Sequence, residues 1–269
     1  MKLNYKILSA LFIGLLFNAC TDSFEEINTN RFQITPEMAK SDGIAIGGNI
    51  TAMEKCVVPV GTQADGTSIV NKYQVAYNLS ADVWSGYFSQ NNNWGGGANN
   101  TTYFLTDPWI AASYQAAYTD ILPLWKEVKL ESEKYNTPEF YALAQILKIS
   151  SWHKATDMFG PIPYKKAGEP ILIVPYDSQE EVYKSFFKDL EDAIKVLTEA
   201  NNQGMKISPE YDAVYAGNTV KWLKYANSLM LRLAMRVRYV DLAMAQKYAE
   251  QAVNHPVGVM TSVDCTSSN

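Results

Sequence analysis

The segment Ser151–Tyr164 constrains the fold more than any other, because it joins an apolar helical pattern to residues that stop a helix. Gly160 can adopt a positive φ without a Cβ penalty, and it therefore favours a helix end. Pro161 and Pro163 lack backbone N–H donors and push the residues before them into extended conformations. Trp152 is too large and apolar for an open loop, so we predict a buried helix that ends abruptly here.

Signals for helix starts recur along the rest of the chain. They combine a capping residue with a proline or an acidic residue in the first turn. They are found at Thr35-Pro36-Glu37, Asp107-Pro108-Trp109, Thr137-Pro138-Glu139, Ser178-Gln179-Glu180-Glu181, Asn218-Thr219 and Asp241. Apolar residues follow these starts at spacings of three and four, with Trp, Tyr and Ala at packing positions. The pattern predicts an all-α fold of tetratricopeptide-like helical hairpins with long irregular loops and little β structure.

Weaker signals refine this expectation. Asn71–Gln90 is predicted to be helical, whereas Gly47 and Gly48 break the helical pattern that precedes it. Pro123 is expected to bend its helix. Ile171–Val174 is the best strand candidate, but the prolines on either side limit it to a short edge element.

The N-terminus has the layout of an export signal. Two lysines precede the apolar run Ile7–Phe17, and the small residue Ala19 precedes Cys20. The run is too short for a comfortable transmembrane helix. A cysteine directly after a small residue looks like a lipoprotein signal, so we expect residues 1–19 to be removed and Cys20 to carry lipid. The alternative is an ordinary cleaved signal that contains a cysteine by chance.

Composition limits the partners. The chain has a formal net charge of −5, and the expected leader contains two of its basic residues, which argues against nucleic acid as a partner. The spacing of Cys56 and Cys265 fits no zinc pattern, and these two thiols could pair in an oxidising compartment. The two histidines show no ligand spacing and no nucleotide motif is present, so we expect neither a metal site nor a cofactor.

Two groups of ionisable residues could carry chemistry. His153 and Asp157 would share a helix face and could orient a general base, but no nucleophile accompanies them, which favours a structural histidine. Lys221, Arg232 and Arg236 would share a face of a later helix, where structural ion pairs are favoured over an anion site.

The richest candidate for ligand binding is the region Trp84–Tyr103. Aromatic side chains offer flat apolar area at low entropic cost, and amides both donate and accept hydrogen bonds, which suits the C–H faces and hydroxyl rim of a sugar. The expected contacts are Trp84, Tyr87, Asn92, Asn93, Trp94 and Tyr103. Trp94 is the strongest candidate, because the neighbouring Gly95 cannot shield it. In the alternative, Trp84 and Tyr87 belong to the core and the Asn–Gly run is only a flexible loop.

Two blocks of sequence carry a resemblance to a known family. Residues 156–164 read Thr-Asp-Met-Phe-Gly-Pro-Ile-Pro-Tyr, and residues 217–236 contain Gly-Asn-x-x-Lys-Trp followed by Asn-Ser-Leu-x-Leu-Arg-Leu-Ala-x-Arg. Together with the lipoprotein-like start, these blocks resemble the SusD/RagB family of nutrient-binding outer-membrane lipoproteins of Bacteroidetes-type bacteria. They stand in the order in which that family carries them.

The resemblance implies a surface-exposed outer-membrane lipoprotein without enzymatic activity. It would capture a glycan or an oligopeptide and pass it to a SusC-type TonB-dependent transporter. Residues 20–34 would form an acidic surface-export tether, and residues 35–269 a helical domain that is incomplete at its C-terminus compared with the family. The alternatives are a surface-anchored degradative enzyme, such as a glycoside hydrolase, and a helical scaffold that holds protein partners.

Overall fold

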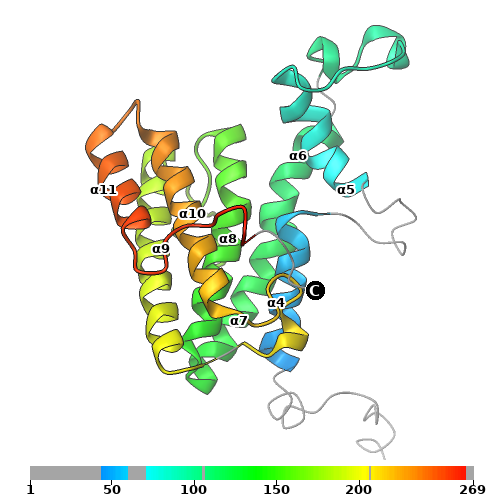
Figure 1. Cartoon of the computed structure of the whole chain (residues 1–269). Helices are drawn as coiled ribbons and strands as arrows, with labels where there is room; N and C mark the ends of the chain where they lie inside the picture. Colours follow the sequence, from blue (N-terminus) through cyan, green and yellow to red (C-terminus); the bar gives the residue numbers. More distant parts are fainter. Residues whose placement is uncertain (1–43, 60–70, 105–106, 206, 265–269) are drawn as a thin grey trace, which may run out of the picture. The chain divides into compact units, whose positions relative to one another are not determined.

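Helices make up most of the computed structural model, which describes residues 44–59, 71–104, 107–205 and 207–264 (Figure 1). All of these residues belong to one unit of the chain, residues 43–269. The expected signal peptide, Cys20, the tether, the helix start at Thr35 and Cys265 lie outside the described residues, so they stay predictions.

The α-helices are α4 (Ile44–Val57), α5 (Asn71–Tyr73), α6 (Asp107–Gln115), α7 (Leu122–Tyr135), α8 (Pro138–Phe159), α9 (Gln179–Asn202), α10 (Thr219–Val237) and α11 (Leu242–Val253). Two π-helical segments, η2 (Gln74–Asp82) and η5 (Ala116–Ile121), and three 3₁₀ turns, η3 (Trp94–Gly97), η4 (Asn100–Thr102) and η6 (Pro209–Tyr211), complete the described elements. The helix predicted for residues 71–90 therefore ends earlier, near Trp84.

No strand forms within the described ranges, where an isolated antiparallel bridge joins Ile162 to Asp177. The short edge element expected at Ile171–Val174 is therefore not formed. The prolines that flank it cannot donate to a ladder, and no neighbouring strand lies among the described residues to pair with it.

The long helices pack in chain order. α7 contacts α8, α8 contacts α9, α9 contacts α10 and α10 contacts α11, so each consecutive pair forms a helical hairpin (Figure 1). α4 packs against both α7 and α8. Each helix buries an apolar seam that it could not bury alone, as in tetratricopeptide-like arrays, and the predicted fold class is confirmed. The largest fully buried side chains include Trp152, Trp222, Phe186 and Phe187.

Capping side chains fix several helix starts where the sequence predicts them. Ser178 and Glu181 form a reciprocal capping box at the start of α9. The Asn218 side chain accepts a hydrogen bond from the backbone N–H of Lys221 at 3.1 Å, and the Asp241 side chain caps α11 in the same way. Each of these starts depends on residues within a single turn, which is why the sequence reveals it.

The break predicted at Gly47 and Gly48 does not occur, because both glycines lie inside α4. The ring of Tyr211 occupies the space beside Gly47, where an added Cβ would lie 2.3 Å from ring atoms. One turn further along α4, the Thr51 hydroxyl donates to the carbonyl oxygen of Tyr211 at 2.8 Å. Gly47 therefore permits the close approach of a segment that is distant in the chain, at the expense of helix propensity.

Pro123 is accommodated without ending its helix. α6, η5 and α7 follow one another without interruption from Asp107 to Tyr135, and η5 ends just before the proline. A π-helical turn pairs residues five apart and so changes the hydrogen-bond ladder next to a residue that cannot donate. The perturbation expected at Pro123 thus coincides with the π-helical segment that precedes it.

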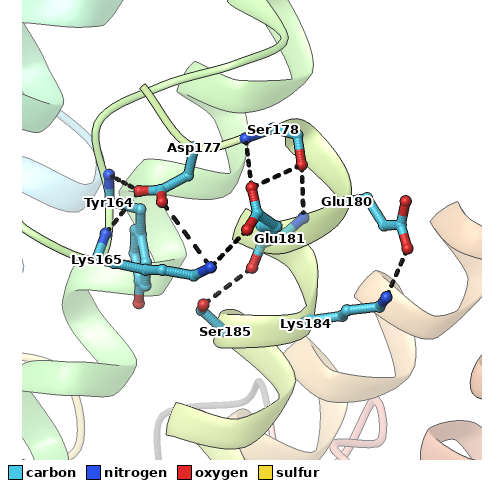
Figure 2. A network of polar contacts seen from close by, with 8 residues as sticks. All are labelled: Tyr164, Lys165, Asp177, Ser178, Glu180, Glu181, Lys184 and Ser185. Carbon is cyan, nitrogen blue, oxygen red and sulfur yellow. Dashed lines mark hydrogen bonds and ion pairs between the residues drawn. The ribbon is translucent and has the colours of Figure 1, made fainter. Parts of the chain in front are cut away.

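A polar network closes the loop that follows α8 (Figure 2). The Asp177 carboxylate accepts hydrogen bonds from the backbone N–H groups of Tyr164 and Lys165, at 2.9 and 2.8 Å. The Lys165 ammonium donates to Glu181 Oε1 at 2.8 Å and so connects the loop to the first turn of α9. The network brings together both ends of the loop, and it thereby helps to place α9 against α8.

A positive charge lies in the core beside this loop. Lys148 of α8 is buried, and its ammonium nitrogen lies 4.0 Å from the centroid of the Trp125 ring and 4.3 Å from that of Tyr164. Burial lowers the pKa of Lys148 to about 8. The aromatic faces replace part of the lost hydration. The Tyr164 hydroxyl also donates to Asp189 of α9 at 2.6 Å, so this tyrosine links the loop after α8 to α9.

We expect Gly160→Val to lower the free energy of unfolding by about 1–3 kcal/mol. Gly160 ends α8 with φ 74° and ψ −118°, which confirms the predicted positive φ. An added Cβ would meet nothing within 4 Å, so the loss would come from backbone strain and not from a clash. Chemical denaturation measures the effect. Gly48→Val is the control, since its Cβ also meets open space without a positive φ; equal stability of the two variants would contradict the expectation.

Candidate functional site

A cleft of about 600 Å³ is lined by η2 and by the irregular segment that follows it. The lining residues are Gln74, Asn78, Leu79, Val83, Phe88, Ser89, Gln90, Asn91, Asn100 and Thr101. We call it the amide cleft, because Gln and Asn provide half of its lining. None of these side chains carries a formal charge, and three of them are apolar.

The first wall of the amide cleft depends on the π-helical geometry of η2. Gln74, Asn78, Leu79 and Val83 all line the cleft. In an α-helix, the step from Gln74 to Val83 would make about two and a half turns and would put the side chains of these two residues on opposite faces. A π-helix pairs residues five apart, so the same step makes about two turns and the two side chains share one face.

The second wall of the amide cleft consists of the lining residues 88–91, 100 and 101. Hydrogen bonds of two buried asparagines, Asn99 and Asn100, hold it in place. Asn100 Nδ2 donates to the carbonyl oxygen of Leu79 at 2.6 Å, and the indole N–H of Trp84 donates to the carbonyl oxygen of Asn100 at 3.1 Å. Asn99 Nδ2 donates to Gln90 Oε1 at 2.8 Å, and its side chain also caps η4. These bonds tie the irregular segment to the helix, so the cleft has a fixed frame.

The lining retains hydrogen-bonding capacity for a ligand. Asn78 donates to Asp82, and the side chains of Gln74 and Asn91 are exposed. Since an amide group both donates and accepts, the cleft suits an uncharged ligand that offers both kinds of partner.

The residues predicted from the sequence are chain neighbours of the lining residues, but they are not among them. Trp84 is half-buried and serves the frame of the cleft through its indole N–H. Tyr87 and Tyr103 are 85% and 71% exposed. Neither Trp84 nor Tyr87 lines the amide cleft, so their predicted ligand contacts stay predictions. The alternative that Tyr87 belongs to the core does not hold, because its side chain is exposed.

The polar residues of the predicted loop are exposed, and its tryptophan is described only in part. Asn92 and Asn93 are both exposed and lie outside the lining. The backbone of Trp94 begins the turn η3, whereas its side chain lies outside the described part of the structure. The role predicted for Trp94 thus stays a prediction.

Sequence reasoning missed Gln74, Asn78, Phe88 and Asn100 as candidate contacts. The signal that could have found them is the density of Gln and Asn between residues 74 and 100, which continues the Asn run at 91–93 in both directions. The common face of Gln74 and Val83 was hidden, because it exists only in a π-helix.

The pair His153 and Asp157 does not form a general base. Burial lowers the pKa of His153 to about 4, and its Nδ1–H donates to the carbonyl oxygen of Ile149 at 2.9 Å. Asp157 instead accepts the hydroxyl of Tyr183 at 2.5 Å and pairs with Arg236 at 2.9 Å. These contacts support the structural roles favoured for His153 and Arg236.

The described residues contain no metal-binding cluster, no membrane-spanning helix and no disulfide of Cys56. No group of three or more His, Cys, Asp or Glu side chains there could hold a metal ion. Among the helices that the structure describes, none has the length and apolar character needed to cross a membrane. Cys56 is half-buried and forms no disulfide with any described residue.

Comparison with known proteins defines the family to which the chain belongs. The family model for SusD-like proteins, described as Susd and RagB outer membrane lipoprotein, matches residues 26–268. The chain therefore belongs to the SusD-like family, as the two sequence blocks indicated, and its location is the outer membrane. No curated protein matches it.

Solved structures agree with the family assignment. A chitin-binding SusD homologue from Flavobacterium johnsoniae is 35% identical with a TM-score of 0.74, over 81% of this chain and 44% of the other. A SusD homologue from Bacteroides uniformis is 36% identical with a TM-score of 0.70, over 82% and 44%. One from Bacteroides vulgatus is 32% identical with a TM-score of 0.73, over 84% and 45%. The chain thus spans less than half the length of these structures.

Proposed function

We propose that the chain is part of a cell-surface lipoprotein that binds a neutral glycan in the amide cleft. The observation that carries this proposal is the uncharged lining, in which amide and hydroxyl side chains adjoin Leu79, Val83 and Phe88. Sugar hydroxyls both donate and accept, as amides do, and sugar C–H faces pack well on apolar and aromatic groups. A charged ligand would find no oppositely charged side chain in this lining.

A relative of known ligand class supports the choice of a glycan. The Flavobacterium johnsoniae homologue is described as chitin-binding, and chitin is a neutral polymer whose sugars carry hydroxyl and amide groups. In the amide cleft, the exposed amide groups of Gln74 and Asn91 match the hydroxyl and amide groups of such a ligand. An oligopeptide is the other ligand class that the cleft could accept by the same hydrogen-bonding chemistry.

The exposed aromatic residues favour an extended ligand. Tyr87 and Tyr103 belong to the same segment as the second wall and present their rings to solvent. We include Trp94, Asn92 and Asn93 with them as contacts for sugar units that continue beyond the cleft. Stacking on such rings adds affinity at low entropic cost, because an aromatic side chain has few rotatable bonds.

The proposed protein binds and transfers its ligand without chemical change. Cys20 carries the lipid anchor, residues 20–34 form the surface tether, and the glycan passes to a SusC-type TonB-dependent transporter. The family resemblance supports this arrangement. Binding without chemical change is supported by the structural role of His153, which was the best candidate for a general base.

Titration of the purified chain against chito-oligosaccharides, malto-oligosaccharides and oligopeptides tests the proposal. We expect a neutral oligosaccharide to bind. Gln74→Ala and Asn91→Ala should each weaken its affinity about 5- to 10-fold, since one hydrogen bond contributes about 1 kcal/mol. Trp94→Ala should weaken the affinity by about 10-fold if the ring stacks on the ligand.

Gln246→Ala, at an exposed position of α11, is the matched control and should leave the affinity unchanged. Circular dichroism confirms that each variant is folded. Unchanged affinity in both Gln74→Ala and Asn91→Ala would remove the amide cleft from the site, and unchanged affinity in Trp94→Ala would remove the loop. Binding of peptides alone would change the ligand class, and shortened oligosaccharides in the product analysis would indicate a hydrolase.

A further inference from the structure

Two buried carboxyl groups meet where α4 contacts residues 207–217, the segment that leads into α10. Glu54 of α4 is 8% exposed, and Asp212 of the segment is 2% exposed. Glu54 Oε2 accepts a hydrogen bond from the backbone N–H of Ala213 at 2.9 Å. Glu54 Oε1 is buried and finds no donor among the described residues, and Asp212 directly precedes Ala213, the residue that binds Glu54 Oε2.

The Asp212 carboxyl group accepts four hydrogen bonds from N–H donors. Its Oδ1 accepts hydrogen bonds from the backbone N–H groups of Val214 and Tyr215, at 3.0 and 2.8 Å. Its Oδ2 accepts from the backbone N–H of Gly217 at 2.8 Å and from the indole N–H of Trp222 at 2.7 Å. These four donors occupy the Asp212 oxygens, so a proton shared by the two carboxyl groups is carried by Glu54.

A proton explains this arrangement better than a metal ion does. A cation between the two carboxyl groups would need free lone pairs on Asp212, and four N–H donors already point at its oxygens. A proton needs only one acceptor lone pair, and it turns the unpaired Glu54 Oε1 into a donor.

Other charged groups around α4 do not form an ion pair with Glu54. Lys55 adjoins Glu54 on the same helix and is exposed. Lys154 of α8 donates to the carbonyl oxygen of Val57 at the C-terminal end of α4. Asp120 of η5 pairs with Lys72 at 3.0 Å. None of these groups pairs with Glu54 in place of Asp212.

We propose that Glu54 and Asp212 share one proton, and that this proton latches residues 207–217 to α4. In this carboxyl latch, Glu54 donates from Oε1 to Asp212 and accepts from Ala213 through Oε2. Loss of the proton places two negative charges together in a buried contact, so the segment should separate from α4 as the pH rises.

The same face of α4 carries the other attachments of the segment. Gly47 lies against the Tyr211 ring, and Thr51 donates to the Tyr211 carbonyl oxygen. Glu54 follows one turn later, so the latch is the last of three successive contacts along one helix face. Opening it would loosen the end of the segment that is nearest to α10.

The pH range over which the latch opens follows from the raised pKa of Glu54. Burial raises the pKa of Glu54 from 4.5 to about 8, the Asp212 charge acts in the same direction, and the bond from Ala213 opposes them. The folded chain therefore keeps a proton that the unfolded chain has already lost. The stability contributed by this proton is complete below pH 4.5 and is lost as the pH rises to about 8.

Chemical denaturation of the native chain and of Glu54→Gln, at several values between about pH 6 and pH 9, tests the latch. Glutamine keeps an acceptor for Ala213 and supplies a permanent donor to Asp212. The unfolding equilibrium constant of the native chain should rise, relative to that of the variant, by up to about tenfold per pH unit below pH 8 and then level off. Lys148 titrates in both proteins, so its contribution cancels.

Glu127→Gln, at an exposed position of α7, is the control and should follow the native chain. An equal pH dependence of the native chain and Glu54→Gln would overturn the proposal. If the variant does not fold, infrared difference spectra of the native chain decide. A carbonyl band of a protonated carboxyl group that disappears near pH 8 supports the latch, and the absence of such a band overturns it.

Discussion

Replacing Gly217 by alanine should lower the free energy of unfolding by about 3 kcal/mol or more, a large effect for one added methyl group. Gly217 has a φ of 80°, a conformation that is strained for alanine. An added Cβ would also lie 2.1 Å from the carbonyl oxygen of Ile207. Because this oxygen belongs to the backbone, it cannot rotate away as a flexible side chain could. The strain and the overlap therefore add.

Gly258→Ala separates the two causes, since Gly258 has a φ of 69° but an added Cβ there would meet nothing within 4 Å. We expect this control to lose only about 1 kcal/mol in the same chemical denaturation. Should Gly217→Ala lose no more stability than Gly258→Ala, the close approach to Ile207 would have to be relaxed at little cost.

Cys20→Ser should shift most of the protein out of the membrane fraction, in a host that processes lipoprotein signals. The expectation follows from the proposal that Cys20 is lipidated, because several acyl chains anchor a protein stably whereas one chain binds only marginally. Fractionation followed by immunoblotting measures the distribution. Incorporation of a labelled fatty acid measures the modification directly, and it should be lost in the variant.

Cys56→Ser is the matched control, because Cys56 is a half-buried residue of α4 and should have no part in anchoring. This variant should keep both the label and the membrane association. Full retention of Cys20→Ser in the membrane fraction, with the label still incorporated, would contradict the assignment of the lipid to Cys20.

The parts of the fold that depend on neighbouring residues could be predicted from the sequence. The capping box at Ser178 and the cap at Asp241 were found because each motif lies within one turn. The position of Gly47 inside α4 could not be predicted in this way, because the space for a side chain there is occupied by the ring of the distant Tyr211. A local pattern cannot show that a glycine is required by a residue so far along the chain.

The structure places a cleft beside the segment that the sequence singled out, whereas the ligand contacts predicted there stay predictions. Aromatic and Asn residues drew attention to the loop after Trp84, whereas the cleft also takes Gln74 and Asn78 from the preceding helix. Periodicity analysis assumes the α-helical repeat, and that repeat assigns Gln74 and Val83 to opposite faces. Only the observed i→i+5 geometry of η2 brings these residues together.

Substitution and length variation should act differently on the amide cleft, because its first wall is π-helical. Exchanging Gln74 or Asn78 alters one hydrogen-bonding group and leaves the other wall residues in place. Removing one residue from Gln74–Asp82 would instead rotate every later side chain of that helix by about a quarter turn. Point changes can therefore alter the lining of the cleft one chemical group at a time, whereas a one-residue deletion would replace much of that lining at once.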